Sequence, residues 1–302
     1  MTSKRAYAVY DVFTDTAYAG NPLAVVFDTA GLDTEAMQKI AAEFNLSETV
    51  FVLPPENENS NARLRIFMPR GELPFAGHPT VGGAIAICER DNVGSPSNLV
   101  LEEEVGRIQC SFEPGSVSHA QFELPVLPKR EEPMMPIDAA AAALNIDAGD
   151  IGFDTHVLTQ WNAGKAYLCV PVKDVSVLQR VVFNESLWLS NFPDEDPLIV
   201  ECPYIYCRKT ENNSASIQAR MFAPHHGIPE DPATGSAAAS LCGALHMFDG
   251  IKSGSAQYVI EQGVEMGRPS QIAVEIDAHN GAITTARIGG HAVKLAEGFL
   301  VA

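Results

Sequence analysis

The chain has 302 residues, of which 46% are hydrophobic and 19% are charged, so it can fill two hydrophobic cores and shows no compositional disorder. Its 38 acidic and 20 basic residues give a formal net charge of −18, which excludes the basic surface that nucleic-acid-binding proteins normally carry. No apolar run is long enough for a signal peptide or a membrane span, so we expect a cytoplasmic protein that binds neither membranes nor nucleic acids.

The first half is dominated by short strand patterns. Its predicted strands cover residues 7–13, 23–27, 48–53, 63–68, 98–101, 107–112 and 121–124. Asp33 is placed to cap a helix over 34–44, in which Met37, Ile40 and Ala41 have helical spacing. Residues 81–90 are small and apolar all round, which predicts a helix buried on every side.

A proline-rich connector over 125–136 separates this half from the second. The second half begins with an alanine-rich helix near Ile137. Its predicted strands cover residues 155–158, 166–170, 198–202, 216–222, 257–260, 271–276, 282–288 and 292–295. We therefore expect two domains, 1–124 and 125–302, and allow the last strand to pack back on the first half.

Few long helices separate the strands, so the predicted class is α+β. Each half would have a mixed, mostly antiparallel sheet with one or two helices. No Gly-x-Gly-x-x-Gly motif follows a strand, so no dinucleotide site is predicted. The six cysteines form no Cys-x-x-Cys pair and lie mostly in apolar stretches, so we expect buried free thiols rather than disulfides.

Two segments of the chain repeat one pattern. Both read Arg-x-Phe-x-Pro, then an apolar residue with Pro, then His or Asp followed by Pro-x-x-Gly-x-Ala. The first copy runs over 65–84 and the second over 220–237, so His78 and Asp231 hold equivalent positions. A helix of small apolar residues follows each copy. The repeat predicts two related halves.

The repeated turns have a physical logic. Proline fits the first turn of a helix, and the backbone N–H groups that follow are exposed at the positive end of the helix dipole. Such an end can bind a carboxylate or an oxyanion, and we expect the two turns to face each other across a cleft between the halves. Alone, His78 would be a hydrogen-bonded turn residue and Asp231 an ordinary helix cap. Their equivalent positions favour a functional role.

Several motifs run in order along nearly the whole chain. They are Gly20-Asn21-Pro22, Leu46-Ser47-Glu48-Thr49, Leu73-Pro74-Phe75-Ala76-Gly77-His78-Pro79-Thr80, Glu230-Asp231-Pro232-Ala233-Thr234-Gly235-Ser236-Ala237, Gln262-Gly263 and Met266-Gly267-Arg268-Pro269-Ser270. In these motifs the chain resembles the phenazine-biosynthesis isomerase family (PhzF-like), which has the diaminopimelate-epimerase-like fold.

The resemblance implies two pseudo-symmetric domains, each a sheet rolled around a central helix, with the active site between them. It also implies a homodimer without metal or organic cofactor. By the resemblance Glu48 carries a proton, and His78 and Asp231 complete the catalytic set. The substrate would be bound by a further group of residues, namely Gly77, Gly235, Ser236 and Asn21.

Related epimerases and racemases of this fold use one cysteine from each half as acid and base. The turns at His78 and Asp231 contain no cysteine, so a two-thiol racemase is disfavoured. The adjacent pair His225-His226 points in two directions, and no neighbouring carboxylate or cysteine spacing completes a ligand set. We therefore predict no metal site.

The predicted function is an isomerase that moves a proton on a small carboxylate-bearing substrate. One alternative is an epimerase, racemase or other proton-transfer enzyme that acts on a different small acid. Another is a catalytically idle member that binds a metabolite or a partner protein. Without the resemblance, Glu48 at a strand entrance would count as an ordinary surface residue, so the role of Glu48 decides between these readings.

Overall fold

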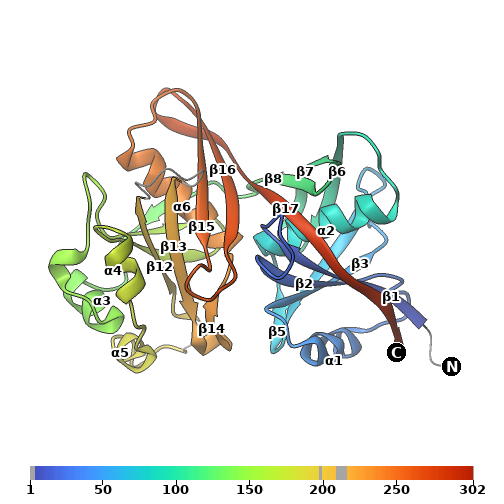
Figure 1. Ribbon diagram of the computed structural model, residues 1–302, viewed down its shortest axis with the longest axis horizontal. Coiled ribbons are helices and arrows are strands. Elements are labelled where there is room, and N and C mark those ends of the chain that lie inside the picture. Colours follow the sequence, from blue (N-terminus) through green and yellow to red (C-terminus); the bar gives the residue numbers. More distant parts are fainter. Residues whose placement is uncertain (1–3, 197–198, 209–215, 302) are drawn as a thin grey trace. The chain divides into compact units, whose positions relative to one another are not determined.

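The computed structural model describes residues 4–196, 199–208 and 216–301 (Figure 1). The chain divides into two compact units. Unit 1 comprises Met1–Pro125 with Arg287–Ala302, and unit 2 comprises Val126–Ala286. The last strand, β17 (Ala282–Val301), therefore begins in unit 2 and ends in unit 1.

Unit 1 contains two helices and a series of strands. In chain order these are β1 (Lys4–Val12), β2 (Asn21–Val26), α1 (Thr34–Phe44), β3 (Glu48–Leu53), β4 (Ala62–Met68), β5 (Gly71–Leu73), α2 (Gly77–Arg90), β6 (Ser97–Glu103), β7 (Gly106–Glu113) and β8 (Ser118–Glu123). The C-terminal part of β17 pairs with β1, and its residues Arg287–Ala292 pair with β8. The final residues of the chain thus complete unit 1.

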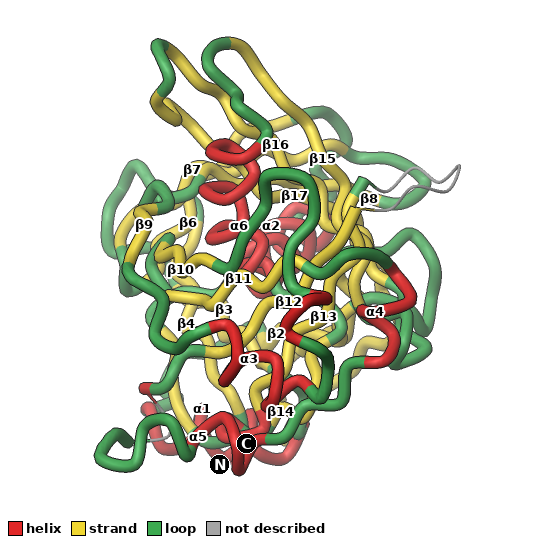
Figure 2. Tube along the Cα trace, turned by 90° about the vertical axis from the view of Figure 1, so that its left-hand side faces the viewer, coloured by secondary structure: helices red, strands yellow, loops and turns green. Residues whose placement is uncertain are grey.

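Unit 2 is larger and contains more helices. Its elements are β9 (Lys129–Glu131), α3 (Ile137–Leu144), η1 (Ala148–Asp150), β10 (Thr159–Asn162), β11 (Ala166–Pro171), α4 (Val175–Arg180), α5 (Glu185–Leu189), β12 (Cys202–Arg208), β13 (Ile217–Ala223), η3 (Pro224–His226), β14 (Ile228–Asp231), α6 (Gly235–Phe248), β15 (Gly254–Gln262) and β16 (Ser270–His279). The short helices α3, α4 and α5 are drawn in red in Figure 2. Their core is centred on the fully buried Trp188.

The strand pairing of unit 1 recurs in unit 2. In unit 1, β2–β3 and β4–β6 are parallel pairs, whereas β1–β2, β3–β4 and β6–β7 are antiparallel. In unit 2, β11–β12 and β13–β15 are parallel, whereas β10–β11, β12–β13 and β15–β16 are antiparallel. Both units thus have mixed sheets, and the repeat found in the sequence corresponds to a repeat in topology.

Each unit has one central, apolar helix. Most residues of α2 are buried, and the helix contacts strands β1 to β4 and β6 to β8. Helix α6 is buried over most of its length and contacts β9, β10, β11 and β16. Small residues allow this packing: a Cβ atom on Gly82 would lie 2.5 Å from Leu23, and one on Gly243 only 2.1 Å from Trp161. The prediction of a helix buried on every side is confirmed for α2.

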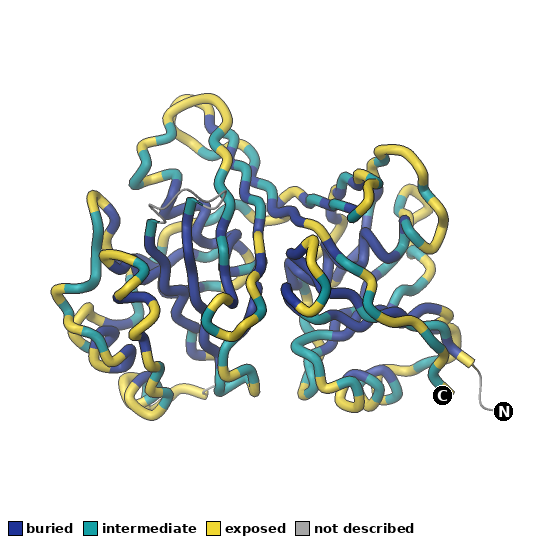
Figure 3. The backbone as a smooth tube through the Cα atoms, viewed as in Figure 1, coloured by how far each residue is buried: buried dark blue, intermediate teal, exposed yellow. Residues whose placement is uncertain are grey.

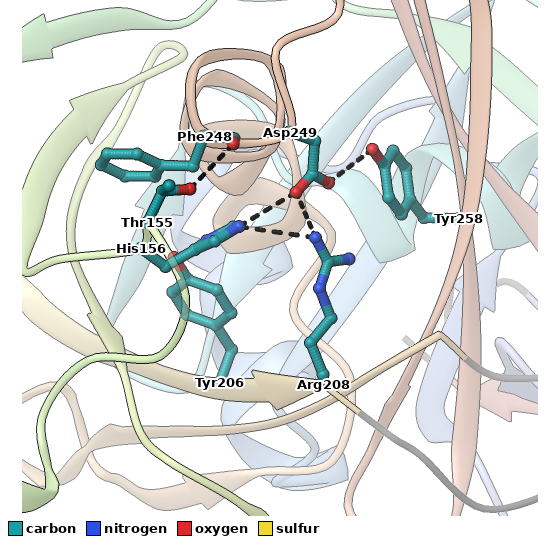
Figure 4. A network of polar contacts seen from close by, with 7 residues as sticks. All are labelled: Thr155, His156, Tyr206, Arg208, Phe248, Asp249 and Tyr258. Atoms are coloured by element: carbon teal, nitrogen blue, oxygen red, sulfur yellow. Dashed lines mark hydrogen bonds and ion pairs between the residues drawn. The ribbon is translucent and has the colours of Figure 1, made fainter.

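A polar network ties the C-terminal end of α6 to neighbouring strands (Figure 4). Asp249 follows the last helical residue and accepts hydrogen bonds from Arg208 and from the Tyr258 hydroxyl, the latter at 2.7 Å. The His156 ring lies 3.1 Å from Asp249 and 2.9 Å from the Tyr206 hydroxyl. This network supplies hydrogen-bond partners for polar groups at the C-terminal end of α6.

Some predicted elements are wrong. Residues 155–158 do not form a strand, and the strand begins only at Thr159. Leu198 lies outside the described residues, and 199–201 precede rather than form a strand, which starts at Cys202. Two strands were expected over 282–295, but β17 is continuous, because Gly289 and Gly290 pair with β8 instead of breaking the strand. Within its described residues, unit 2 has four α-helices where one or two were expected. Helices α4 and α5 were missed because they are too short to show a periodic pattern.

Burial elsewhere follows the expected pattern. All six cysteines are free and buried, as predicted. Strands β12 and β13 are buried along nearly their whole length, as the dark blue of Figure 3 shows. Among the described residues, no helix has both the length and the apolar character needed to cross a membrane.

Candidate functional site

Three predicted site residues of unit 1 come together at the starts of neighbouring elements. Strands β2 and β3 are parallel with Leu23 opposite Glu48, so Asn21 and Glu48 lie at the same edge of the sheet. His78 is in the first turn of α2, and its Nδ1 lies 3.2 Å from Oε2 of Glu48. The sheet register and the start of α2 thus place a carboxyl group against an imidazole.

This pair is well shielded from water. The side chain of His78 is 4% exposed and that of Glu48 is 12% exposed. Burial lowers the pKa of His78 to about 3, with the Pro22 carbonyl acting in the opposite direction, so the imidazole is neutral near pH 7. The 3.2 Å approach of Glu48 Oε2 to His78 Nδ1 is therefore a contact with a neutral imidazole and not a salt bridge.

A neutral imidazole suits a carboxyl group that changes its protonation state. With a proton on Nδ1, His78 can donate to Glu48 as a carboxylate; in the other tautomer, Nδ1 can accept from Glu48 as the acid. The 3.2 Å separation places Glu48 Oε2 and His78 Nδ1 within reach of either arrangement. The imidazole is therefore near enough to interact with Glu48 before and after Glu48 takes up a proton.

The predicted residues of unit 2 gather at the start of α6. Gly235 and Ser236 are the first two residues of the helix, and Asp231 ends β14 four residues before it. The Thr234 hydroxyl donates to Oδ2 of Asp231 at 2.6 Å. The Ser236 hydroxyl lies 2.8 Å from the Tyr167 hydroxyl of β11. Asp231 and Ser236 are thus both held by neighbouring side chains.

The expectation that His78 and Asp231 occupy equivalent helix starts is wrong. Helix α2 begins at Gly77, so His78 and Pro79 lie in its first turn. Helix α6 begins at Gly235, so Asp231 is the last residue of a strand and is not the helix cap, which is Thr234. The sequence match predicts alignment of the turns but cannot fix where each helix begins.

Gln262, from the quoted Gln-Gly motif, holds the Asp231 turn in place. Its Nε2 donates to the Asp231 carbonyl at 2.7 Å and to the Thr234 hydroxyl at 2.9 Å. Its Oε1 accepts from the Tyr204 hydroxyl at 3.1 Å and from the backbone N–H of Thr234 at 3.2 Å. The amide is fully buried, and all of its donors and acceptors are used. Next to it, a Cβ on Gly263 would lie 2.7 Å from the Pro232 carbonyl.

The central helices differ from several others at their N-termini. Helices α1, α4 and α5 are each capped by a side chain, those of Asp33, Asp174 and Asn184. Neither Ala76 before α2 nor Thr234 before α6 makes a side-chain capping hydrogen bond. The N–H groups of a first helical turn have no partner within the helix. Those of Gly77, Gly235 and Ser236 are therefore placed to bind an anion.

Sequence reasoning missed several residues that support the site. Tyr167 was assigned only to a strand, yet its buried hydroxyl contacts Ser236. Glu103 lies behind the first turn of α2, where its Oε1 is 2.7 Å from the Thr80 hydroxyl. A strand pattern carries no signal for either contact, since both partners are distant in the sequence. The one sequence signal of such contacts is a polar side chain at a strand position that is expected to be buried.

The structure places a cysteine beside His225 and His226, which the spacing in the sequence did not indicate. Cys202, which is 23 residues from His225, lies beside both imidazoles. The contact depends on the antiparallel pairing of β12 with β13, which spacing alone does not show.

One cavity of unit 1 does not include the predicted site residues. It has a volume of about 400 Å³ and is lined in part by Tyr7, Tyr10, Glu89, Arg90 and Glu297. The Tyr10 hydroxyl donates to Glu89 there at 3.0 Å. This cavity therefore lies apart from the pair formed by Glu48 and His78.

Comparison with known sequences supports a single family. Residues 10–298 match the model of the family described as phenazine biosynthesis-like protein. The chain is 46% identical to an uncharacterized isomerase of Mesorhizobium japonicum, over 98% of both chains. It is 34% identical to the trans-2,3-dihydro-3-hydroxyanthranilate isomerase of Pseudomonas aeruginosa, over 97% of this chain and 98% of the relative.

Solved structures give the same result at the level of the fold. A PhzF family protein of Bacillus anthracis matches with a TM-score of 0.88 at 23% identity, over 99% of this chain and 100% of the other. A hydroxyproline epimerase from Agrobacterium vitis matches with a TM-score of 0.68 at 12% identity, over 99% and 92% of the two chains. The chain belongs to the phenazine biosynthesis-like (PhzC-PhzF) family and, like its named relatives, is an isomerase.

Proposed function

We propose that this isomerase moves a proton on a small carboxylate-bearing substrate without a cofactor, and that Glu48 carries the proton. The observation that supports this most directly is the 3.2 Å contact between Glu48 Oε2 and His78 Nδ1. A carboxyl group that is shielded from water and lies beside a neutral imidazole can act first as a general base and then as a general acid. The Pseudomonas aeruginosa relative is named for an acid substrate, trans-2,3-dihydro-3-hydroxyanthranilate, which we propose as the first test compound.

The proposed reaction has two proton transfers. In the first, a C–H bond of the substrate breaks, the proton passes to Glu48, and the electron pair remains on the substrate as a delocalised, enolate-like anion. In the second, Glu48 returns the proton to a different carbon atom of the same substrate. The number of atoms and electrons is unchanged, as an isomerisation requires. His78 holds the Glu48 carboxyl group through both steps.

We further propose that the other predicted residues bind the substrate. The N–H groups of Gly77, Gly235 and Ser236 suit a carboxylate or a developing oxyanion, because they lie at the positive ends of α2 and α6. Asp231 is anchored by Thr234 and Gln262, so its carboxyl group is held in one orientation to accept from a substrate amino or hydroxyl group. Asn21, which is fully buried at the start of β2, offers an amide beside Glu48.

We also infer that the two units are copies of one ancestral unit, as in the diaminopimelate-epimerase-like fold. Support comes from the order of parallel and antiparallel pairs, which is the same from β1 to β7 as from β10 to β16. Helices α2 and α6 occupy the same position in that order. The chemistry proposed for Glu48 belongs to unit 1 alone, since no matching carboxyl group is identified in the second copy.

The decisive experiment replaces Glu48 with Gln and follows the uptake of deuterium from D2O into the substrate by NMR. We expect the Glu48→Gln variant to lose about 100- to 10,000-fold in turnover, the range typical of a general acid–base group. Glu35→Gln is the matched control, because Glu35 is an exposed helix residue paired only with Lys39. Thermal unfolding of both variants would show that the fold is retained.

The outcomes separate the proposed function from its alternatives. Unchanged deuterium uptake in Glu48→Gln would exclude Glu48 as the proton carrier. Deuterium at a stereocentre without a shift of a double bond would indicate an epimerase. Saturable binding of the acid without any exchange in the wild-type protein would indicate an idle, metabolite-binding member of the family.

A further inference from the structure

Cys202, His225 and His226 form a compact group of metal-binding side chains in unit 2. One ligand atom from each residue can be chosen such that all three lie within 4.8 Å of one another. Cys202 is the first residue of β12, whereas the two histidines form the end of η3. No step of the proposed isomerisation uses any of the three.

The fold explains why they meet. Strands β12 and β13 are antiparallel with Tyr204 opposite Met221, so the start of β12 lies beside the end of β13. Ala223 ends β13 and leads directly into η3, which closes at Gly227 with a left-handed φ of 85°. The tight turn therefore returns both imidazoles towards the first residue of β12. Across the sheet, Cys202 is also the parallel partner of Tyr167.

The distances suit a tetrahedral metal ion. The Nε2 atom of His225 is 3.5 Å from Sγ of Cys202 and 3.2 Å from the carbonyl oxygen of Val200. Zinc bound by thiolate and imidazole at its usual bond lengths separates two such ligands by about 3.5 Å. The separation of this Cys202–His225 pair therefore matches that of two ligands on one zinc ion.

One ring nitrogen points to an additional ligand. Nε2 of His226 is buried and makes no hydrogen bond within the described part of the chain. Buried polar atoms are nearly always paired, so those that are not require a partner such as a bound ion. A simpler arrangement, in which His225 donates to Val200, would leave the His226 nitrogen unexplained.

The surrounding charges are compatible with a cation whose ligands include a thiolate. Lys165 acts electrostatically on all three residues and opposes a positive ion. The carboxylates of Glu201, which acts on Cys202, and of Glu185, which acts on His225, have the opposite charge and favour a positive ion. With the negative charge of a bound thiolate added, the local balance favours a divalent cation.

We propose that Cys202, His225 and His226 bind one divalent transition-metal ion, with zinc as the best fit. A thiolate with two imidazoles is a borderline-soft ligand set, which favours zinc and cobalt over magnesium and calcium. On binding, the Cys202 thiol loses its proton to solvent and the sulfur donates to the metal. The proposed reaction itself needs no metal.

The test is a cobalt titration of the full chain, purified without a histidine tag and freed of metal with a chelator. We expect saturation at one equivalent, a thiolate-to-cobalt charge-transfer band in the near ultraviolet and intense visible bands of tetrahedral cobalt, all displaced by zinc. Weak, non-saturable binding, or saturable binding without the thiolate band, would overturn the proposal. This measurement uses the wild-type protein and so does not depend on any variant folding.

Variants assign the ligands. Cys202→Ser should abolish the charge-transfer band, and His226→Gln should weaken cobalt binding by about 100-fold or more. Cys242→Ser and His119→Gln are the controls, since Cys242 is a buried thiol within α6 and His119 lies on β8 of unit 1. Retention of the band in Cys202→Ser would refute the assignment. Metal-free protein should keep its isomerase activity, so failure of one proposal does not imply failure of the other.

Discussion

Thr80 and Glu103 are joined by a buried hydrogen bond, in which the Thr80 hydroxyl donates to Oε1 of Glu103 at 2.7 Å. The same hydroxyl oxygen lies 2.8 Å from the Ala76 carbonyl. A hydroxyl group has one proton, so Thr80 donates to one of these acceptors at a time. The hydrogen bond from Thr80 lowers the pKa of Glu103, but burial acts in the opposite direction, is the larger effect and raises this pKa to about 8.

We predict that Glu103→Gln removes a pH dependence of stability. Between pH 4.5, the ordinary pKa, and about 8, folded Glu103 keeps a proton that the unfolded chain releases. The contribution of Glu103 to the free energy of unfolding is thus greatest below pH 4.5. It decreases as the pH rises towards 8, by at most about 1.4 kcal/mol per pH unit. Urea unfolding at pH 5, 6.5 and 8 should show Glu103→Gln gaining stability relative to wild type as the pH rises. Exposed Glu58→Gln is the control, and a constant difference across this range would contradict the prediction.

His78 should produce a pH dependence of the opposite sign. Its pKa is lowered from 6.5 to about 3, so between these values the unfolded chain binds a proton that the folded chain does not. Its contribution to stability is present above pH 6.5 and is lost as the pH falls towards 3. We expect the wild type to lose more stability than His78→Gln between pH 7 and pH 4, measured by urea unfolding. The exposed His279→Gln should behave as the wild type, and equal losses in all three proteins would refute the neutral, buried assignment.

Tyr167 should act through Ser236. Loss of one neutral hydrogen bond costs about 1 kcal/mol, so Tyr167→Phe should lower kcat/KM about fivefold if Ser236 binds the substrate. In a Ser236→Ala background the same change should have little further effect. Steady-state kinetics of the double-mutant cycle measures this coupling, with the exposed Tyr18→Phe as the control. Additive effects would show that Tyr167 does not position Ser236.

Gly243 should be intolerant of a single added methyl group. A Cβ there would lie 2.1 Å from the Trp161 ring, and overpacking of this kind costs about 1–3 kcal/mol. Gly94→Ala is the matched control, because nothing lies within 4 Å of its Cβ position. Chemical denaturation should show a clear loss for Gly243→Ala and none for Gly94→Ala. Alanine is the better helix former, so an increase in stability at Gly243 would show that Trp161 moves aside.

Local sequence signals predicted those elements whose causes are local. Helix α1 has the predicted bounds, because Asp33 caps it and its apolar residues have helical spacing. Strand β3 likewise covers the predicted residues, Glu48–Leu53. The small residues of α2 and α6 identified both central helices, since only small side chains fit that close to the strands.

Features that depend on distant partners could not be predicted in this way. Residues 289–291 lie between two predicted strands, yet the strand is continuous there, and a Cβ on Gly289 would lie 2.9 Å from Gln121 of β8. The glycine is present because two strands approach closely there. The support of Ser236 by Tyr167 and the position of Cys202 beside His225 depend on strand pairing in the same way. The sequence motifs thus identified candidate residues, whereas only the fold shows what holds them.

The path of β17 has a consequence for how the protein is made. Unit 2 is one continuous segment, Val126–Ala286, and all of its residues have been translated before those of unit 1 are complete. Strand β1 is synthesised before unit 2, whereas its partner strand β17, with Leu300 opposite Arg5, is completed after unit 2. Domains fold as units during synthesis. The unit that contains Glu48 and His78 is therefore completed after unit 2. If translation stops just after Ala286, the released chain contains all of unit 2, but the unit with Glu48 and His78 lacks a strand of its sheet.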